Sequence, residues 1–200
     1  MELHLISTGK QPKQTLVDVL SNVHSYADYI HLRERHFSVR DYLDTIDKLI
    51  AADVPLEKII INDRVDVAYV VKACGVQLGA GSLPPEKVVQ TFPGLRVGCS
   101  VHGINEATEK GKAGADYLVY GHVFPTASKP GLPPRGLAAL RRVVGSISIP
   151  IIAIGGIKPR HVEQIKETGA EGIAVLSGIL LADDARGAAA AYNDAIKGVT

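Results

Sequence analysis

The stretch IPIIAIGGIKPRHVEQIKETGAEGIAVLSG, residues 149–178, contains the pattern from which the fold follows. Two short apolar runs, residues 149–154 and 172–176, flank a segment whose apolar residues recur at helical spacing. Each run ends in a turn with glycine, first Gly155-Gly156 and then Ser177-Gly178. Continuous apolar runs are typical of parallel strands that are buried on both faces. The stretch therefore predicts a strand–helix–strand unit of a parallel sheet.

The same alternation continues through the rest of the chain. Apolar runs stand at residues 3–7, 29–32, 58–61, 76–78, 96–100, 117–120, 149–154 and 172–176. Helical segments follow them at residues 14–25, 38–50 and 65–73, from Pro84 onward, and at 105–112, 137–144, 159–168 and 183–197. Eight such units in 200 residues predict an α/β protein, a (β/α)8 TIM barrel with short loops that forms a single domain over residues 1–200. The main alternative is an open doubly wound sheet, but Thr8-Gly9-Lys10-Gln11 stands where its glycine-rich motif would follow the first strand.

Three side chains of the second unit have predicted local roles. Ser38 and Asp41 stand at the start of a helical segment and approximate a capping box, with Asp in place of the usual Glu. His31 alternates with Leu32 on the second strand, so its side chain can point into the barrel.

The composition argues against several classes of protein. The formal net charge is +1, which disfavours a nucleic acid or a membrane surface as the main partner. No apolar stretch approaches the roughly 20 residues of a membrane span, and the chain begins directly with a strand-like run. Cys74 and Cys99 are the only cysteines and lack metal-type spacing. We therefore expect a soluble cytoplasmic protein without a disulfide, and a homo-oligomer stays open.

The turns after the last two strands are the first candidate site. In barrels of this type the active site lies where the strands end, and phosphate often binds between the last two loops through backbone N–H groups and a helix N-terminus. Gly155, Gly156 and Gly178 would let the backbone approach an anion, and Ser177 can donate its hydroxyl. Ordinary turn chemistry is the alternative, because glycine is common between a strand and a helix.

The long loop after the sixth strand, residues 124–136, is the second candidate. Its Thr126, Ser128 and Lys129 could bind an anion, and its prolines suggest a lid, with a solvated surface loop as the alternative. His122 stands just before this loop and is the leading candidate for a general acid or base.

Other polar groups at the predicted strand ends weigh less. His102, after the fifth strand, competes with the histidine before the long loop. Asp63 and Asp66 could hold Mg²⁺ only with a second carboxylate, and the loop over residues 79–82 offers none. We therefore expect no metal and no other cofactor.

Eight motifs occur in one order over nearly the whole chain. They are His31-Leu32-Arg33-Glu34-Arg35, Ile61-Asn62-Asp63-Arg64-Val65-Asp66, Gly75-Val76-Gln77-Leu78-Gly79, Gly98-Cys99-Ser100-Val101-His102, Ala115-Asp116-Tyr117, Phe124-Pro125-Thr126, Ile154-Gly155-Gly156-Ile157 and Gly169-Ala170-Glu171-Gly172-Ile173-Ala174-Val175. Together they resemble the thiamin phosphate synthase superfamily. One branch joins a pyrimidine pyrophosphate to a thiazole phosphate with Mg²⁺, and the other is the thiazole tautomerase TenI.

Several departures from the synthase pattern resemble the TenI branch. His31 and Arg35 take the outer places of a motif that commonly reads Gln-Leu-Arg-x-Lys. Gln77 replaces a His, Ser82 replaces a second Mg²⁺-binding Asp, and Gly121-His122 replaces Gly-Pro. The resemblance implies an isomerase of thiamin biosynthesis that aromatises a dihydrothiazole carboxylate phosphate by proton transfer, with His122 as the catalytic residue. Two alternatives stay open, the Mg²⁺-dependent synthase and a non-catalytic regulator that binds a thiazole phosphate.

The resemblance also assigns residues to the substrate, a small-molecule thiazole phosphate. The positions that match its thiazole-phosphate contacts are Thr126, Ser128, Gly156, Leu176 and Ser177. The positions that match contacts to the pyrimidine pyrophosphate in the synthase are Asn62, Ser100 and Lys129. Arg33 is a candidate for holding the substrate carboxylate, and an exposed salt bridge is its alternative.

Overall fold

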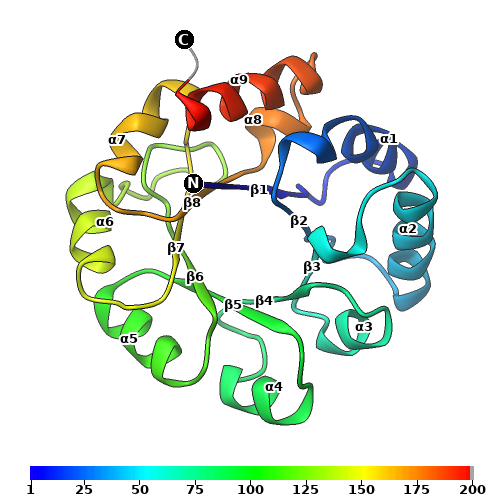
Figure 1. Ribbon diagram of the computed structural model, residues 1–200, viewed down its shortest axis with the longest axis horizontal. Coiled ribbons are helices and arrows are strands. Elements are labelled where there is room, and N and C mark those ends of the chain that lie inside the picture. The colour runs from blue at the N-terminus through cyan, green and yellow to red at the C-terminus, as the bar shows by residue number, and fades with distance from the viewer. Residues whose placement is uncertain (199–200) are drawn as a thin grey trace.

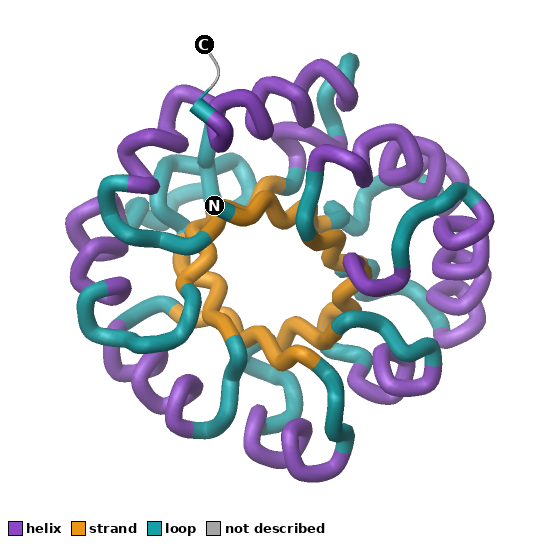
Figure 2. Tube along the Cα trace, in the orientation of Figure 1, coloured by secondary structure: helices purple, strands orange, loops and turns teal. Residues whose placement is uncertain are grey.

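Eight parallel strands close into a barrel in the computed structural model of the protein, which describes residues 1–198. The strands are β1 (Glu2–Ile6), β2 (Tyr29–Leu32), β3 (Ile59–Asn62), β4 (Gly75–Leu78), β5 (Arg96–Val101), β6 (Tyr117–Gly121), β7 (Ile151–Ile154) and β8 (Gly172–Val175). Each strand pairs with its neighbours in the sequence, and β8 returns to pair with β1. Helices surround the barrel on all sides (Figures 1 and 2). The predicted (β/α)8 barrel is therefore confirmed.

The helices follow the strands in the predicted alternation. They are α1 (Lys13–Val23), α2 (Val39–Ala51), α3 (Val65–Val70), α4 (Pro85–Thr91), α5 (Ile104–Lys112), α6 (Gly136–Val144), α7 (Val162–Lys166), α8 (Ser177–Leu180) and α9 (Ala185–Lys197), with the 3₁₀ turns η1 (His24–Tyr26), η2 (Leu56–Lys58) and η3 (Pro159–His161). The segment predicted as one helix over residues 159–168 is divided between η3 and α7. The sequence analysis missed α8, because a single turn is too short to show apolar periodicity. Within residues 1–198, none of these helices has the length and apolar character needed to cross a bilayer.

The core has two layers. The larger layer lies between the strands and the helices, where apolar faces such as Leu16 and Leu20 of α1 and Ile46 and Leu49 of α2 are almost fully buried. The smaller layer fills the inside of the barrel; it consists of Ile6, Ile60, Tyr117, Val119, Ile152 and Ala174. Filling the interior with side chains makes the barrel a packed body whose rim can hold loops in fixed positions.

A polar cluster occupies part of the barrel interior. His31 points inward as its alternation indicated, and its Nε2 lies 2.8 Å from Nδ1 of His4. The other ring nitrogen of His4 lies 3.0 Å from a carboxylate oxygen of Glu2. The guanidinium of Arg96 lies over the ring of Tyr117, 4.7 Å from its centroid. Ionisable groups therefore pack inside this barrel together with apolar ones.

The start of α2 confirms the predicted capping box. The amide of Asp41 donates to Oγ of Ser38 at 3.2 Å, and the amide of Ser38 donates to the Asp41 carboxylate at 2.9 Å. These two bonds satisfy backbone donors that the first helical turn leaves without partners, and such a cap stabilises a helix by about 1 kcal/mol.

Candidate active site

The carboxyl ends of the strands bring the predicted site residues to one end of the barrel. All eight strands are parallel, so the loops that follow them leave at the same end. In the closed strand order, β7 and β8 lie across the barrel from β3 and β4 (Figure 1). We call the group after β7 and β8 the glycine side; its members are Gly155, Gly156, Leu176, Ser177 and Gly178. We call the group at the ends of β2, β3 and β5 the polar side; its members are Arg33, which follows β2, Asn62, the last residue of β3, and Ser100, which lies near the end of β5.

The glycine side begins with a turn that only glycine fits. Gly155 and Gly156 have φ values of +99° and +67°, which side-chain-bearing residues rarely adopt. A Cβ on Gly155 would overlap the side chain of His122, and a Cβ on Gly156 would stand 2.7 Å from the carbonyl oxygen of Phe124. The amide of Phe124 donates to the Gly155 carbonyl at 3.0 Å. The turn after β7 is therefore packed directly against the start of the loop after β6.

The glycine side continues at the start of α8. Within residues 1–198, no hydrogen bond uses the amide N–H of Gly156, Ser177 or Gly178 as its donor. A Cβ on Gly178 would stand 2.7 Å from the hydroxyl of Tyr192, which fixes the backbone at this point. Free amides in a fixed turn favour the binding of an anion.

The loop after β6 is held at its base. His122 is 6% exposed, and its Nε2 lies 3.2 Å from the carbonyl oxygen of Leu132. Because a carbonyl only accepts, Nε2 carries the proton, and Nδ1 has no hydrogen-bond partner among residues 1–198. Arg135 holds the other end of the loop, since its amide donates to the His122 carbonyl at 2.9 Å and its Nε donates to the Gly121 carbonyl at 3.1 Å.

Three predicted ligands lie within this loop. Oγ1 of Thr126 accepts from the amide of Ser128 at 3.3 Å. The amine of Lys129 reaches the loop after β5, where it lies 3.3 Å from Nε2 of His102. The loop therefore carries a positive charge from β6 toward the polar side.

The polar side is built from the ends of three strands. The amide of Arg33 donates to Oγ of Ser7 at 2.7 Å, which holds the end of β2 against β1. Burial lowers the pKa of the Arg33 guanidinium, and the charge of nearby Arg35 adds to the effect. Asn62 ends β3, and Oγ of Ser100 on β5 accepts from Nε2 of Gln77 at 3.1 Å. A guanidinium, an amide and a hydroxyl are groups that can donate to an anion.

The sequence analysis missed two contacts of the site. One is the bond from Gln77 to Ser100, and the other is the approach of Lys129 to His102. Both join residues at least 23 positions apart. The polar character of Gln77 within an apolar strand was the visible indication, but its partner depends on the pairing of β4 with β5.

The residues at the position of the synthase metal do not fit a site with two carboxylates. Asp63 supplies one carboxylate, and its amide donates to the Gln77 carbonyl at 2.9 Å. Ser82 stands in place of the second, and its Oγ accepts from the amide of Gly79 at 2.8 Å. Among the described residues no group of three or more His, Cys, Asp and Glu is arranged to hold a metal ion. We therefore assign no step to Mg²⁺.

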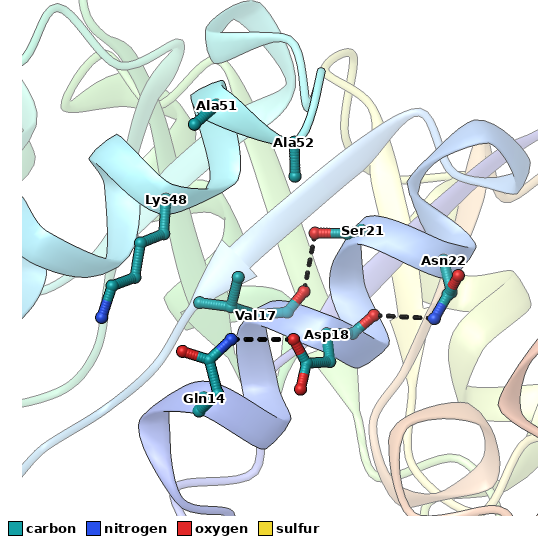
Figure 3. A pocket seen from close by; sticks show the side chains of 8 residues that line it. All are labelled: Gln14, Val17, Asp18, Ser21, Asn22, Lys48, Ala51 and Ala52. Carbon is teal, nitrogen blue, oxygen red and sulfur yellow. Dashed lines mark hydrogen bonds between the residues drawn. The ribbon is translucent and has the colours of Figure 1, made fainter.

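A surface groove between α1 and α2 lies apart from the barrel end (Figure 3). Its side-chain hydrogen bonds stay within α1, from Gln14 to the Asp18 carboxylate and from Ser21 to the Val17 carbonyl. None of the predicted site residues lines this groove. Its position excludes it as the candidate active site.

Comparison with known proteins gives consistent matches. Residues 3–179 match the family model described as thiamine monophosphate synthase. A thiamine-phosphate synthase of Pyrococcus furiosus is 46% identical over 126 residues, 63% of this chain and 61% of that protein. The match to that relative thus spans less than two thirds of its length. A thiamine-phosphate synthase of Pyrococcus horikoshii is 35% identical over 189 residues, 93% of this chain and 90% of that protein.

Solved structures agree with this result. A thiamine phosphate pyrophosphorylase from Pyrococcus furiosus superposes with a TM-score of 0.83 at 33% identity, covering 99% of this chain and 96% of the other. A 3-hexulose-6-phosphate synthase superposes with a TM-score of 0.74 at 19% identity over 98% of this chain and all of the other, which shows a common fold alone.

These matches contradict the prediction of a thiazole tautomerase. The relatives are named as synthases, which are transferases, so the expectation of an isomerase was wrong. The error came from weighing a few single residues above the whole chain. In the structure Gln77 bonds Ser100, Ser82 bonds Gly79 and His122 bonds Leu132. Each of these contacts is possible without a change of reaction.

Proposed function

Because this chain belongs to the thiamine monophosphate synthase family, we propose that it is a thiamine-phosphate synthase. Such a transferase joins a thiazole phosphate to a pyrimidine carried as its pyrophosphate, and releases pyrophosphate. The observation that carries the proposal is the presence, on opposite sides of one barrel end, of two groups of residues that can donate hydrogen bonds to an anion. Two phosphorylated substrates need two such groups. When both substrates are bound at the same end of the barrel, a reaction between two separate molecules becomes a step within one complex, which lowers its entropic cost.

The glycine side would bind the thiazole phosphate. The free amides of Gly156, Ser177 and Gly178 supply donors that are fixed by the backbone. Ser177 adds its hydroxyl, and Thr126 adds another from the loop that follows β6, the strand next to β7. Backbone donors need no rearrangement when the anion arrives, which favours binding. Gly155, Leu176 and Ser128 complete this part of the proposed site.

The polar side would bind the pyrophosphate of the pyrimidine. Arg33 and Lys129 bring positive charge, and Asn62 and Ser100 bring neutral donors. When the bond to the pyrimidine breaks, negative charge accumulates on the departing pyrophosphate. Donors and cations already aimed at that position stabilise it more than they stabilise the bound substrate, which lowers the barrier.

His122 stays a proposed catalytic residue at the base of the loop after β6. Its Nε2 is committed to the Leu132 carbonyl, so Nδ1 is the nitrogen available to a substrate. In this proposal His122 and the other residues that resemble TenI are substitutions within the active site of a synthase. The expected ligands remain small-molecule phosphates.

Incubation with both substrates tests the proposal directly. The purified protein is mixed with the thiazole phosphate and the pyrimidine pyrophosphate, with and without MgCl₂, and thiamine phosphate and pyrophosphate are measured by chromatography. We expect both products in equal amounts in at least one of the two conditions, and loss of turnover on heat inactivation. No product in either condition would refute the proposal.

A further inference from the structure

The polar side is supported from inside the barrel by a buried tyrosine and a buried glutamine. Tyr117 on β6 is 0% exposed and Gln77 on β4 is 4% exposed. The strand between them, β5, contributes Gly98, which is paired in register with both. A Cβ at Gly98 would overlap the hydroxyl of Tyr117 and Oε1 of Gln77. The two polar atoms therefore border the same small space, which exists because residue 98 has no side chain.

The two atoms in this space are complementary. Neither the Tyr117 hydroxyl nor Oε1 of Gln77 has a hydrogen-bond partner within the described residues. The hydroxyl is a donor and the amide oxygen only accepts. Burial raises the pKa of Tyr117 well above its ordinary value, so its proton is retained at neutral pH. Leaving either atom unpaired in the core would be costly, and a hydrogen bond from the hydroxyl to the amide oxygen would satisfy both.

The other end of Gln77 determines which way Ser100 can bond. Nε2 of Gln77 donates to Oγ of Ser100 at 3.1 Å. The serine oxygen is therefore used as an acceptor on its inner side, and its proton is left for a partner at the barrel end. A serine without this contact can present either its proton or a lone pair to a ligand.

We propose that Tyr117, Gln77 and Ser100 form a chain in which every donor points toward the barrel end, and that Gln77 is the positioning residue which fixes Ser100 as a donor to a pyrophosphate oxygen. The identity of the anion rests on the proposed function. An anion accepts hydrogen bonds and cannot donate them, so a fixed donor favours it over a neutral ligand. In this role Gln77 acts through Ser100 and not as a ligand of the anion.

Replacement of Gln77 by its isostere gives a sharp test. In Gln77→Glu the carboxylate can only accept, so the Ser100 proton turns inward and the anion loses its donor. Gln77→Met removes the polar group while filling the space. Tyr117→Phe removes only the first donor of the chain. Tyr26→Phe, which alters a partly exposed hydroxyl that accepts from Arg186, is the matched control.

The affinity for inorganic pyrophosphate is measured by calorimetry, with and without MgCl₂, for these variants, for Ser100→Ala and for the double variant of Gln77→Met with Ser100→Ala. We expect Gln77→Met and Ser100→Ala each to weaken binding about tenfold, and the double variant to bind no more weakly than Ser100→Ala alone. Tyr117→Phe should weaken binding about threefold, Gln77→Glu should weaken it most, and Tyr26→Phe should leave it unchanged. The KM for the pyrimidine pyrophosphate should rise while that for the thiazole phosphate does not.

Three outcomes would overturn the inference. They are additive losses in the double variant, unchanged affinity in Gln77→Met, and absence of pyrophosphate binding by the unaltered protein. If the pattern of affinities appears but no thiamine phosphate forms, the proposed function fails and the donor chain stands. Since Gln77→Met and Tyr117→Phe introduce no buried charge, the test does not depend on the folding of Gln77→Glu.

Discussion

Acid should destabilise this barrel through the two histidines in its interior. The side chains of His4 and His31 are fully buried, and their facing nitrogens are 2.8 Å apart. Burial is the main cause that lowers the pKa of each below the ordinary value of 6.5. Nearby His4 and Arg96 lower the pKa of His31 further, whereas the bond to Glu2 opposes the shift of His4. Protonating both rings would also bring two N–H groups face to face.

The sign of the effect follows from proton counting. Below pH 6.5 the unfolded chain binds more protons than the folded protein, because the folded pKa values are lower. The stabilisation is therefore complete above that pH and decreases as the pH falls toward the folded values. Each proton taken up on unfolding changes the free energy of unfolding by about 1.4 kcal/mol per pH unit, so the pair contributes up to about 2.7 kcal/mol per pH unit. In a chain of this length that lowers the melting temperature by up to about 10 °C per pH unit.

Urea unfolding between about pH 5.5 and 7.5 measures this slope. In His31→Gln the slope should decrease by up to about 1.4 kcal/mol per pH unit, with the largest decrease at the acid end of this range, since one of the two buried titrating rings is gone. His24 and His161, whose pKa values are also lowered mainly by burial, contribute equally to both proteins and cancel in the difference. His36→Gln is the control, because that side chain is 60% exposed. Equal slopes for the unaltered protein and His31→Gln would refute the reasoning.

Three further substitutions test other parts of the molecule. Gly156→Ala should raise the KM for the thiazole phosphate at least about tenfold, because its Cβ would meet the Phe124 carbonyl at 2.7 Å at a φ of +67°. Gly94→Ala is its control: φ is +90°, and no atom of the described residues lies within 4 Å of the new Cβ, so stability should fall by about 1 kcal/mol while the KM stays the same. Equal KM values for these two variants would contradict the prediction. Ser177→Ala should weaken the binding of inorganic phosphate about threefold to tenfold in calorimetry, and an unchanged affinity would leave the backbone amides as the only donors. Ser38→Ala should lower the free energy of unfolding by about 1 kcal/mol in urea titrations without changing activity, and an unaltered midpoint would show that the cap contributes nothing.

The fold could be predicted because its pattern is local. Apolar runs such as residues 151–154 and helical periodicity such as that of α2 are properties of neighbouring residues, and their alternation leaves few topologies open. The ends of elements were less certain: the final strand was expected to end at Leu176, but it ends at Val175 and Ser177 starts α8. Helix ends depend on tertiary contacts such as the packing of Gly178 on Tyr192, which no local pattern records.

The candidate site could be predicted in part, for the same reason. That residues after successive strands share one end follows from parallel topology, so Asn62, Ser100 and Ser177 were expected together. The bond between Gln77 and Ser100 depends on the register of β4 on β5, and the approach of Lys129 to His102 depends on the path of a long loop. Neither the strand register nor the path of the loop can be predicted from the local sequence, because both depend on contacts between distant segments.

The prediction of the reaction failed because the glycine side does not distinguish one reaction from another, and the residues of the polar side can be interpreted in two ways. The glycine side supplies backbone amides, which suit a phosphate whatever reaction follows, so it does not separate a synthase from other enzymes on this barrel. The polar side supplies side chains, and residues such as Ser82 that depart from the synthase pattern lie near it. Ser82 could be interpreted either as the replacement of a metal-binding Asp or as a residue that stabilises a turn. In the structure its hydroxyl accepts from the amide of Gly79 within the turn. The affinity for pyrophosphate is therefore the measurement on which the proposed function depends most, because only the polar side is proposed to bind the pyrophosphate of the second substrate.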